Sequence, residues 1–280
     1  MSGTLYLVPT PIGNLSDLSP RAVDTLSQAD FIAAEDTRVT LKLLNHFHIK
    51  KPMVAYYRHN TAAGGQAILN RILSGETCAL VSDAGTPAVS DPGEELVRLC
   101  VAHGINVVAL PGPCALTTAL SVSGLPTGRF TFEGFLAMNK KNRREHLNAL
   151  KNEPRTMIFY EAPHKLLATL QDFSTVFGPD RPVALCRELT KLHEEVIRTT
   201  LAQAVERYQT ESPKGEFVLV VGGAEPIKEE AASPEDALVQ VNKLRQAGLS
   251  LKDATRQVAD ELGLKRNLLY AMAVEAERAD

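Results

Sequence analysis

Short apolar segments alternate with amphipathic segments over the first 122 residues of the chain. The intervening segments, such as Pro20–Gln28 and Glu94–His103, have helical periodicity, and Gly104 is a typical residue just beyond a helix end. This alternation predicts an α/β fold, with a parallel sheet covered by helices on both faces. The apolar segments with strand character cover residues 5–8, 31–34, 53–56, 77–81 and 106–110.

A second series of strand patterns follows the turn-rich segment Ser123–Gly128, which we interpret as a domain boundary. Only a short polar turn separates its third and fourth members, so we expect these two to pair in a mixed sheet. We predict one α/β domain at residues 1–123 and a second at residues 124–224. The strand patterns of the second domain cover residues 129–135, 155–160, 183–189, 195–200 and 216–221.

The last part of the chain, residues 234–280, has helical patterns only and follows a linker at residues 222–233. The segment Ser250–Asp253 fits a capping box, and Gly263 separates two helical stretches. This layout predicts a small module that is like a helix-turn-helix. A three-helix packing module without a nucleic-acid role has the same pattern, so both interpretations stay open.

Three predicted strands of the first domain end in corners that are rich in proline and glycine, at Pro9–Leu15, Ser82–Pro87 and Pro111–Ala115. Carboxyl ends of parallel strands meet at one sheet edge, where ligands bind. Phosphate-binding glycine motifs are absent, and Asp83 is the lone charge in these corners. The corners therefore predict a nearly uncharged pocket for a nucleoside and an amino-acid moiety, although tight turns alone would also explain each one.

Composition narrows the function classes. The chain has 44% hydrophobic residues, no apolar run of membrane-spanning length and no secretory pattern after Met1, so we expect action in the cytoplasm. The four cysteines form no C-x-x-C pair and the histidines no H-E-x-x-H motif, so we expect reduced thiols and no metal site. A net charge of −3 disfavours general nucleic-acid binding. We therefore expect any polyanion to bind locally, at the basic stretch of residues 140–151.

Several of these segments resemble one known family, the tetrapyrrole methylase superfamily, and within it the branch that methylates small-subunit ribosomal RNA. The resemblance continues through the second domain and the helical tail, so it covers nearly the whole chain. The segments that carry it are Pro9–Leu15, Ala34–Arg38, Ser82–Pro87, Pro111–Pro113, Phe159–Glu161, Arg187–Lys191 and Gly215–Glu216.

The resemblance implies two α/β domains that hold S-adenosylmethionine in a cleft between them, and a homodimer. It further implies 2′-O-methylation of a cytidine in the decoding region of 16S rRNA, within the small ribosomal subunit. The first corner, Pro-Thr-Pro-Ile-Gly, departs from the porphyrin-acting branches, which argues against a tetrapyrrole substrate. Carried over by position, the cofactor-binding residues are Pro9, Thr10, Pro11, Ile12, Gly13, Asp83, Ala84, Gly85, Thr86, Pro111, Gly112, Pro113, Cys114, Ala115, Tyr160 and Glu216.

A ribose hydroxyl is weakly acidic, so a nearby base should accelerate its methylation. Candidate bases near predicted strand ends are Glu35, Glu161, His164 and Glu188. We favour Glu188 and Glu161, which flank the expected cleft in the second domain. Each of them could instead pair with a neighbouring cation such as Arg187 or Lys191.

Two basic groups are candidates for binding the RNA backbone. Arg38 could orient a phosphate through a bidentate hydrogen bond, or Asp36 could neutralise it. The second group follows a predicted strand of the second domain, and a merely solvated basic face has the same pattern. Its members are Lys140, Lys141, Arg143 and Arg144.

Two other functions compete with RNA methylation. A tetrapyrrole C-methyltransferase would use the same two-domain cleft. A ligand-sensing regulator would bind nucleic acid through the tail helices, but residues 234–280 hold seven basic and eight acidic side chains. A module with a net negative charge is poorly suited to bind duplex DNA by itself.

Overall fold

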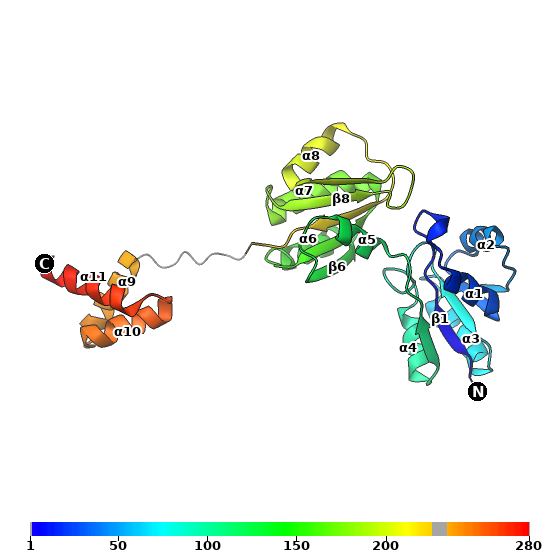
Figure 1. The fold of residues 1–280 in the computed structure, drawn as a ribbon, viewed down its shortest axis with the longest axis horizontal. Helices are drawn as coiled ribbons and strands as arrows, with labels where there is room; N and C mark the ends of the chain where they lie inside the picture. The colour runs from blue at the N-terminus through cyan, green and yellow to red at the C-terminus, as the bar shows by residue number, and fades with distance from the viewer. Residues whose placement is uncertain (1, 226–233, 280) are drawn as a thin grey trace. The chain divides into compact units, whose positions relative to one another are not determined.

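The computed structural model describes residues 2–225 and 234–279. The chain divides into two compact units, Met1–Ala224 and Glu225–Asp280 (Figure 1). The larger unit contains two five-stranded sheets, and the described residues of the smaller one, from 234 onward, form three helices. Among the described residues, no helix combines the length and apolar character that crossing a bilayer requires.

The first sheet is entirely parallel, which confirms the prediction from the alternating pattern. Its strand order is β3-β2-β4-β1-β5. Two of its interior strands, β2 and β4, are buried along their whole length, as expected for a sheet covered on both faces. The strands are β1 (Thr4–Leu7), β2 (Phe31–Ala34), β3 (Met53–Ala55), β4 (Cys78–Val81) and β5 (Asn106–Ala109).

Helices cover both faces of this sheet. On one face, α1 (Pro20–Gln28) and α2 (Thr37–His46) bury apolar side chains such as Leu26 and Leu44. On the other face, α3 (Thr61–Leu73) and α4 (Glu94–Ala102) bury a second cluster against the same strands. A short 3₁₀ turn, η1 (Leu15–Asp17), follows the first corner.

The second sheet is mixed, in the order β6-β7-β10-β8-β9. Strands β6 and β7 are parallel, and the remaining pairs, including the predicted β8–β9 neighbours, are antiparallel. The sequence therefore predicted both the mixed character and this pairing correctly. The strands are β6 (Phe130–Phe135), β7 (Thr156–Glu161), β8 (Pro182–Arg187), β9 (Glu195–Thr200) and β10 (Phe217–Val221).

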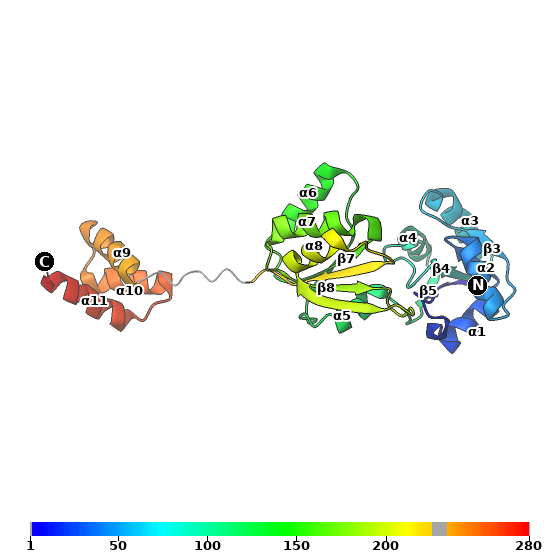
Figure 2. The same cartoon turned by 90° about the horizontal axis from the view of Figure 1, so that it is seen from above.

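The second sheet also has helices on both faces (Figure 2). One face packs against α6 (Lys140–Ala149), α7 (Leu166–Phe177) and α8 (Leu201–Thr210). The opposite face packs against α5 (Ala115–Val122), which directly follows the third Pro/Gly corner. Helix α5 thus belongs with the second sheet by packing, although it precedes the boundary expected at residue 123. A 3₁₀ turn, η2 (Pro163–Lys165), joins β7 to α7.

The smaller unit contains α9 (Pro234–Gln246), α10 (Leu251–Leu262) and α11 (Arg266–Ala279) around one apolar core. The Ser250 side chain accepts a hydrogen bond from the Asp253 N–H and so caps α10. Gly263 ends the same helix with a φ of 64°, in the left-handed region that favours glycine. The Asp253 carboxylate accepts from the Ser250 hydroxyl at 2.6 Å. The N-cap half of the predicted capping box and the glycine break are therefore both present.

Candidate functional site

The three Pro/Gly corners converge at the carboxyl edge of the first sheet. Thr10 and Gly85 exchange backbone hydrogen bonds with N–O distances of 2.9 and 3.0 Å. The Thr10 hydroxyl donates to the Ser82 carbonyl at 3.1 Å, which fixes the first corner against the second. The Thr86 hydroxyl donates to the Pro113 carbonyl at 2.9 Å and so ties the second corner to the third.

Two glycines allow these corners to approach their neighbours. A Cβ on Gly112 would lie 2.7 Å from the Pro9 Cβ, so only glycine lets the third corner pack on the first. A Cβ on Gly13 would lie 2.4 Å from the Lys191 Cγ and 2.8 Å from the Thr190 hydroxyl. Gly13 is therefore the point where the first corner meets the loop that follows β8.

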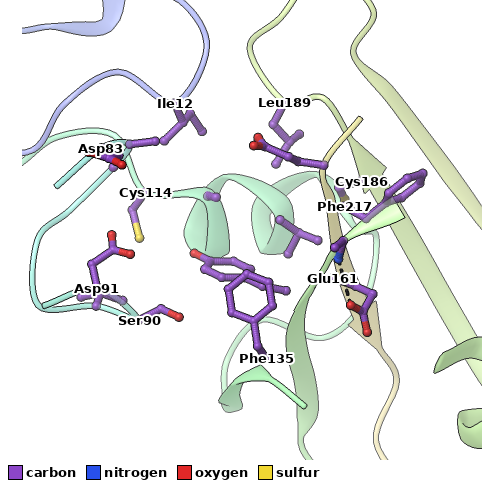
Figure 3. Close-up of a pocket in the computed structure, with 18 of the residues that line it drawn as sticks. Ile12, Asp83, Ser90, Asp91, Cys114, Phe135, Glu161, Cys186, Leu189 and Phe217 are labelled. Carbon is purple, nitrogen blue, oxygen red and sulfur yellow. Dashed lines mark hydrogen bonds between the residues drawn. The ribbon is translucent and has the colours of Figure 1, made fainter. Parts of the chain in front are cut away.

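A cavity of about 550 Å³ lies in front of the corners, between them and the ends of β7, β8 and β10 (Figure 3). We refer to the part of the larger unit built on the first sheet as the first lobe and to the part built on the second sheet as the second lobe. The cavity walls combine the edge of the first sheet with apolar side chains of the second lobe, including Phe135 and Leu189. The predicted cofactor residues that line it are Ile12, Asp83, Ala84, Gly85, Thr86, Cys114, Ala115, Tyr160 and Glu216. Those that do not line it are Pro9, Thr10, Pro11, Gly13, Pro111, Gly112 and Pro113.

The expectation of a nearly uncharged pocket is wrong. Glu35, Asp83 and Asp91 all line the cavity from the first lobe, and Figure 3 shows Asp91 pointing toward Cys114. The Asp36 N–H donates to one Asp83 oxygen at 3.0 Å, which joins the end of β2 to the second corner. Asp91 lies ten residues beyond β4 and returns to the cavity because Ala88 and Ser90 both adopt positive φ angles, 68° and 69°.

These three carboxylates stand in an unfavourable electrostatic environment. Burial, reinforced by the charge of Glu35, raises the pKa of Asp91 to about 6. Burial and the Asp83 charge raise the pKa of Glu35, and burial raises the pKa of Asp83. A cation placed in the cavity would relieve this mutual repulsion.

Tyr160 connects the cavity to the start of α5. Its hydroxyl oxygen accepts a hydrogen bond from the Leu116 N–H at 3.1 Å, and burial raises its pKa. The ring packs edge-on against Phe132 and Phe135 with centroid distances of 5.0 and 5.6 Å. Tyr160 therefore forms a rigid apolar wall, and its hydroxyl is already used to cap a helix.

Glu161, one of the favoured catalytic bases, lines the cavity but has its carboxylate occupied. One oxygen accepts from the Ala162 N–H at 2.8 Å (Figure 3), and the other accepts from the Thr169 hydroxyl at 2.5 Å. Arg143 donates to the same Thr169 oxygen at 2.8 Å and to Asp172 at 2.7 Å. The side chain of Glu161 therefore belongs to a buried network that fastens β7 to α6 and α7.

Glu188, the other favoured base, does not line the cavity. One of its oxygens accepts from the Glu216 N–H and from the Lys191 ammonium, both at 2.9 Å. The first of these hydrogen bonds, followed by the second, lowers the pKa of Glu188 and so weakens it as a base. Lys191 also bonds the Glu216 carboxylate at 2.9 Å and lines the cavity, a position that its sequence context did not indicate.

The remaining candidates differ in their exposure. Arg38 is exposed but forms a bidentate ion pair with Asp36, at 3.0 and 2.6 Å. In the basic group, the Arg143 guanidinium is drawn into the Glu161 network, whereas the other three side chains are exposed on the first turns of α6. Those three are Lys140, Lys141 and Arg144. His164 is exposed in η2 and does not line the cavity.

Comparison with known proteins gives this arrangement a family. Residues 4–205 match the model of the tetrapyrrole (corrin/porphyrin) methylases. The chain belongs to the tetrapyrrole methylase family. Residues 231–277 match the RsmI C-terminal HTH domain, which agrees with the predicted helix-turn-helix layout. Membership confirms the prediction of a methyltransferase that uses S-adenosylmethionine.

The chain is also similar over its whole length to proteins named ribosomal RNA small subunit methyltransferase I. The protein from Synechocystis is 49% identical over 98% of this chain and 99% of its own length. The protein from Escherichia coli O157:H7 is 47% identical over 98% of this chain and 96% of its own length.

Solved structures share the fold at lower identity. The methyltransferase CobJ superposes with a TM-score of 0.60 at 19% identity and covers 80% of this chain and 95% of its own. A uroporphyrin-III C-methyltransferase from Thermus thermophilus, solved in complex with S-adenosylhomocysteine, superposes with a TM-score of 0.54 at 19% identity. It covers 78% of this chain and 97% of its own. These similarities confirm the predicted fold class.

Proposed function

We propose that this protein methylates the ribose 2′-oxygen of a cytidine in the decoding region of small-subunit (16S) ribosomal RNA. The names of its full-length relatives support ribosomal RNA as the substrate. The observation that carries the proposal is the acid-lined cavity at the meeting point of the three corners. Homodimerisation, action in the cytoplasm and recognition of the assembled small subunit stay predictions.

The residues of the cavity fit the methyl donor by size and by charge. A volume of about 550 Å³ lies within the range of about 300–1,000 Å³ that small-molecule sites occupy. S-adenosylmethionine carries a sulfonium and an ammonium against one carboxylate, so its net charge is positive. The lining has five acidic residues and only one basic residue, Lys191, which already bonds two carboxylates. A polyphosphate would be repelled by the same walls.

The predicted cofactor residues would divide into two roles. Those that line the cavity would contact the donor, with small corner residues such as Gly85 and Ala115 exposing their main chain to it. Those behind the lining, such as Thr10 and Gly112, would hold the corners in register. Ile12, Val89 and Leu189 supply apolar surface for an adenine ring.

The proton of the ribose hydroxyl needs an acceptor at the cavity. S-adenosylmethionine bound in the cavity would supply an electrophilic methyl group on its sulfonium sulfur. Asp91 suits the acceptor role, because a pKa of about 6 makes its carboxylate a stronger base while it stays largely ionised near neutral pH. Glu35 is the second candidate, since burial raises its pKa as well. Glu161 and Glu188 are less suitable, because backbone N–H groups and side-chain donors already occupy them.

The decisive experiment supplies the purified protein with labelled S-adenosylmethionine and two alternative acceptors. One is small ribosomal subunits from cells that lack the protein, and the other is uroporphyrinogen. We expect label in a single cytidine of the 16S rRNA, which nuclease digestion and mass spectrometry would locate on the ribose. Label in the porphyrinogen alone would contradict the proposal and favour a tetrapyrrole C-methyltransferase.

A further inference from the structure

A second cavity adjoins the first on the opposite side of Asp83. It has a volume of about 340 Å³ and lies between the first corner and helix α2. Asp83 lines both cavities, so this carboxylate forms part of the wall between them. The resemblance assigns Thr10 and Pro11 to the cofactor, but these two residues line the second cavity and not the acid-lined one. We refer to the second cavity as the α2 groove.

One side of the α2 groove is basic. Lys42 and His46 line it, and Arg38 lies one helical turn before Lys42 on the same face of α2. Arg38 is paired with Asp36, whereas Lys42 forms no ion pair with the described residues. The groove therefore offers positive charge at its rim, in contrast to the acid-lined cavity beyond Asp83.

The other side of the α2 groove is apolar and partly open to solvent. Pro11, Leu15, Val39 and Leu43 line it, and Leu15 and Val39 are 42% and 39% exposed. Thr10 and Ser82 also line the groove, but their hydroxyls donate to the carbonyls of Ser82 and Gly85 and so hold the corners together. An apolar slot with a cation at its rim is an arrangement that can hold an unstacked base beside its phosphate.

We infer that the α2 groove binds a nucleotide of the RNA next to the one that is methylated. This inference rests on the proposed function, since the acid-lined cavity must then receive the reacting ribose. The base of the neighbouring nucleotide enters between Pro11, Leu15 and Val39, and Lys42 contacts its phosphate. The shared Asp83 wall places the two nucleotides side by side along one strand, which must be single-stranded for both to enter.

Charge favours RNA over a second copy of this chain as the occupant. An acidic protein surface would satisfy Lys42, but the exposed apolar residues at this groove, Leu15 and Val39, form a narrow slot beside Lys42 rather than a broad apolar face. Such interfaces between identical chains are usually more apolar at their centre. A single nucleotide can contact both sides of the groove, because its base would pack on the apolar side while its phosphate would bind Lys42.

A matched pair of tryptophan variants tests the apolar side. Val39→Trp fills the groove, whereas Leu41→Trp adds the same ring on the same helix at an exposed position that does not line it. We expect Val39→Trp to raise the KM for small ribosomal subunits by about 5- to 100-fold, as loss of a stacked base does, and Leu41→Trp to leave it unchanged. An equal KM for both variants would overturn the inference.

A matched pair of lysine variants tests the basic side. Lys42→Ala should weaken subunit binding and reduce the slope of log affinity against log salt by roughly 0.7–1, as removal of one phosphate-binding cation does. Lys50→Ala removes an equally exposed charge beyond the end of α2 and should leave the slope unchanged. A slope that is the same in both variants would also overturn the inference. This pair decides the matter if Val39→Trp does not fold.

Two controls separate the inference from the proposed function. If the wild-type protein transfers no methyl group to ribosomal RNA, the proposed function fails before the groove is tested. If it does, each variant should still bind S-adenosylmethionine with wild-type affinity, and a changed KM then reports on the groove alone. Altered sedimentation of the Val39 or Lys42 variant would assign the groove to a second copy of the chain and would overturn the inference.

Discussion

Carboxylates of both lobes lie in or beside the acid-lined cavity, but they are held in different ways. In the second lobe, Glu161 and Glu188 accept hydrogen bonds from backbone N–H groups and from a threonine or lysine side chain. In the first lobe, Glu35 accepts only a long hydrogen bond from the Asp83 N–H at 3.5 Å, and Asp91 is hydrogen-bonded by the Ser82 side chain. Neither carboxylate forms an ion pair with any described residue, and burial raises the pKa of both. The comparison teaches that a position at a strand end does not make a carboxylate reactive. Its partners decide whether it is structural or available to a ligand.

The largest expected effect comes from removing the charge of Asp91. Asp91→Asn should reduce the rate of methyl transfer by about 100-fold or more, the usual contribution of a general base. Single-turnover kinetics with small ribosomal subunits would measure this rate. Asp24→Asn, at an exposed position on α1, is the matched control and should behave like the wild type. A wild-type rate of methyl transfer for Asp91→Asn would show that Asp91 is not the base, and would contradict the contrast drawn between the carboxylates of the two lobes.

The next effect concerns Glu161, which should act on stability. Glu161→Gln replaces an acceptor with a donor in a buried network, so it should lower the free energy of unfolding by about 1–3 kcal/mol. Urea unfolding would measure the change, and Glu145→Gln on the exposed face of α6 should leave stability unchanged. A stable Glu161→Gln protein with a selectively reduced rate would show instead that Glu161 takes part in the chemistry.

Asp91 should also affect stability, with the opposite sign. Its pKa rises from an ordinary value of 3.8 to about 6 on folding, so the folded protein binds this proton more tightly than the unfolded chain. Its contribution to stability is therefore lost as the pH rises through this window. Asp91→Asn should raise the melting temperature at pH 7.5 by a few degrees and have little effect at pH 4. A lower melting temperature at pH 7.5 would contradict the assignment.

The smallest effect is expected at α6. Replacing Lys140, Lys141 and Arg144 with Ala should flatten the salt dependence of subunit binding by about one unit for each phosphate that these side chains bind, without changing affinity for the methyl donor. Arg143→Ala should instead lower stability, because this guanidinium supports Thr169 in the Glu161 network. If both variants changed only the salt dependence, the network would not be the main role of Arg143.

Much of the fold follows from local pattern. The strands of the first sheet and their parallel direction were predictable, because apolar periodicity and Pro/Gly corners are local signals. The packing of α5 was not, because apolar side chains such as Leu116 and Leu120, which pack on the second sheet, do not indicate by their sequence pattern which sheet they cover. Only the three-dimensional contacts assign this helix to the second sheet.

Likewise, the sequence predicted the location of the site but not its charge. The three corners could be placed together because parallel strands end at one edge. The charge of the cavity could not, because Asp91 reaches it only through the positive φ angles of two residues that are not glycine, Ala88 and Ser90. The hydrogen bonds that Glu161 and Glu188 accept could not be predicted either, because their donors, such as the Thr169 hydroxyl and the Glu216 N–H, are distant in the sequence.

The acid-lined cavity should bind a cationic methyl donor through Asp91 and its neighbours, and every role proposed above depends on this binding. Calorimetric titration with S-adenosylmethionine between pH 5 and pH 8 tests it most directly. We predict one donor bound per chain, with an affinity that rises as the pH passes about 6, where Asp91 ionises, and a much weaker pH dependence in Asp91→Asn. Absence of binding, or the same pH dependence in both proteins, would contradict this role of the cavity.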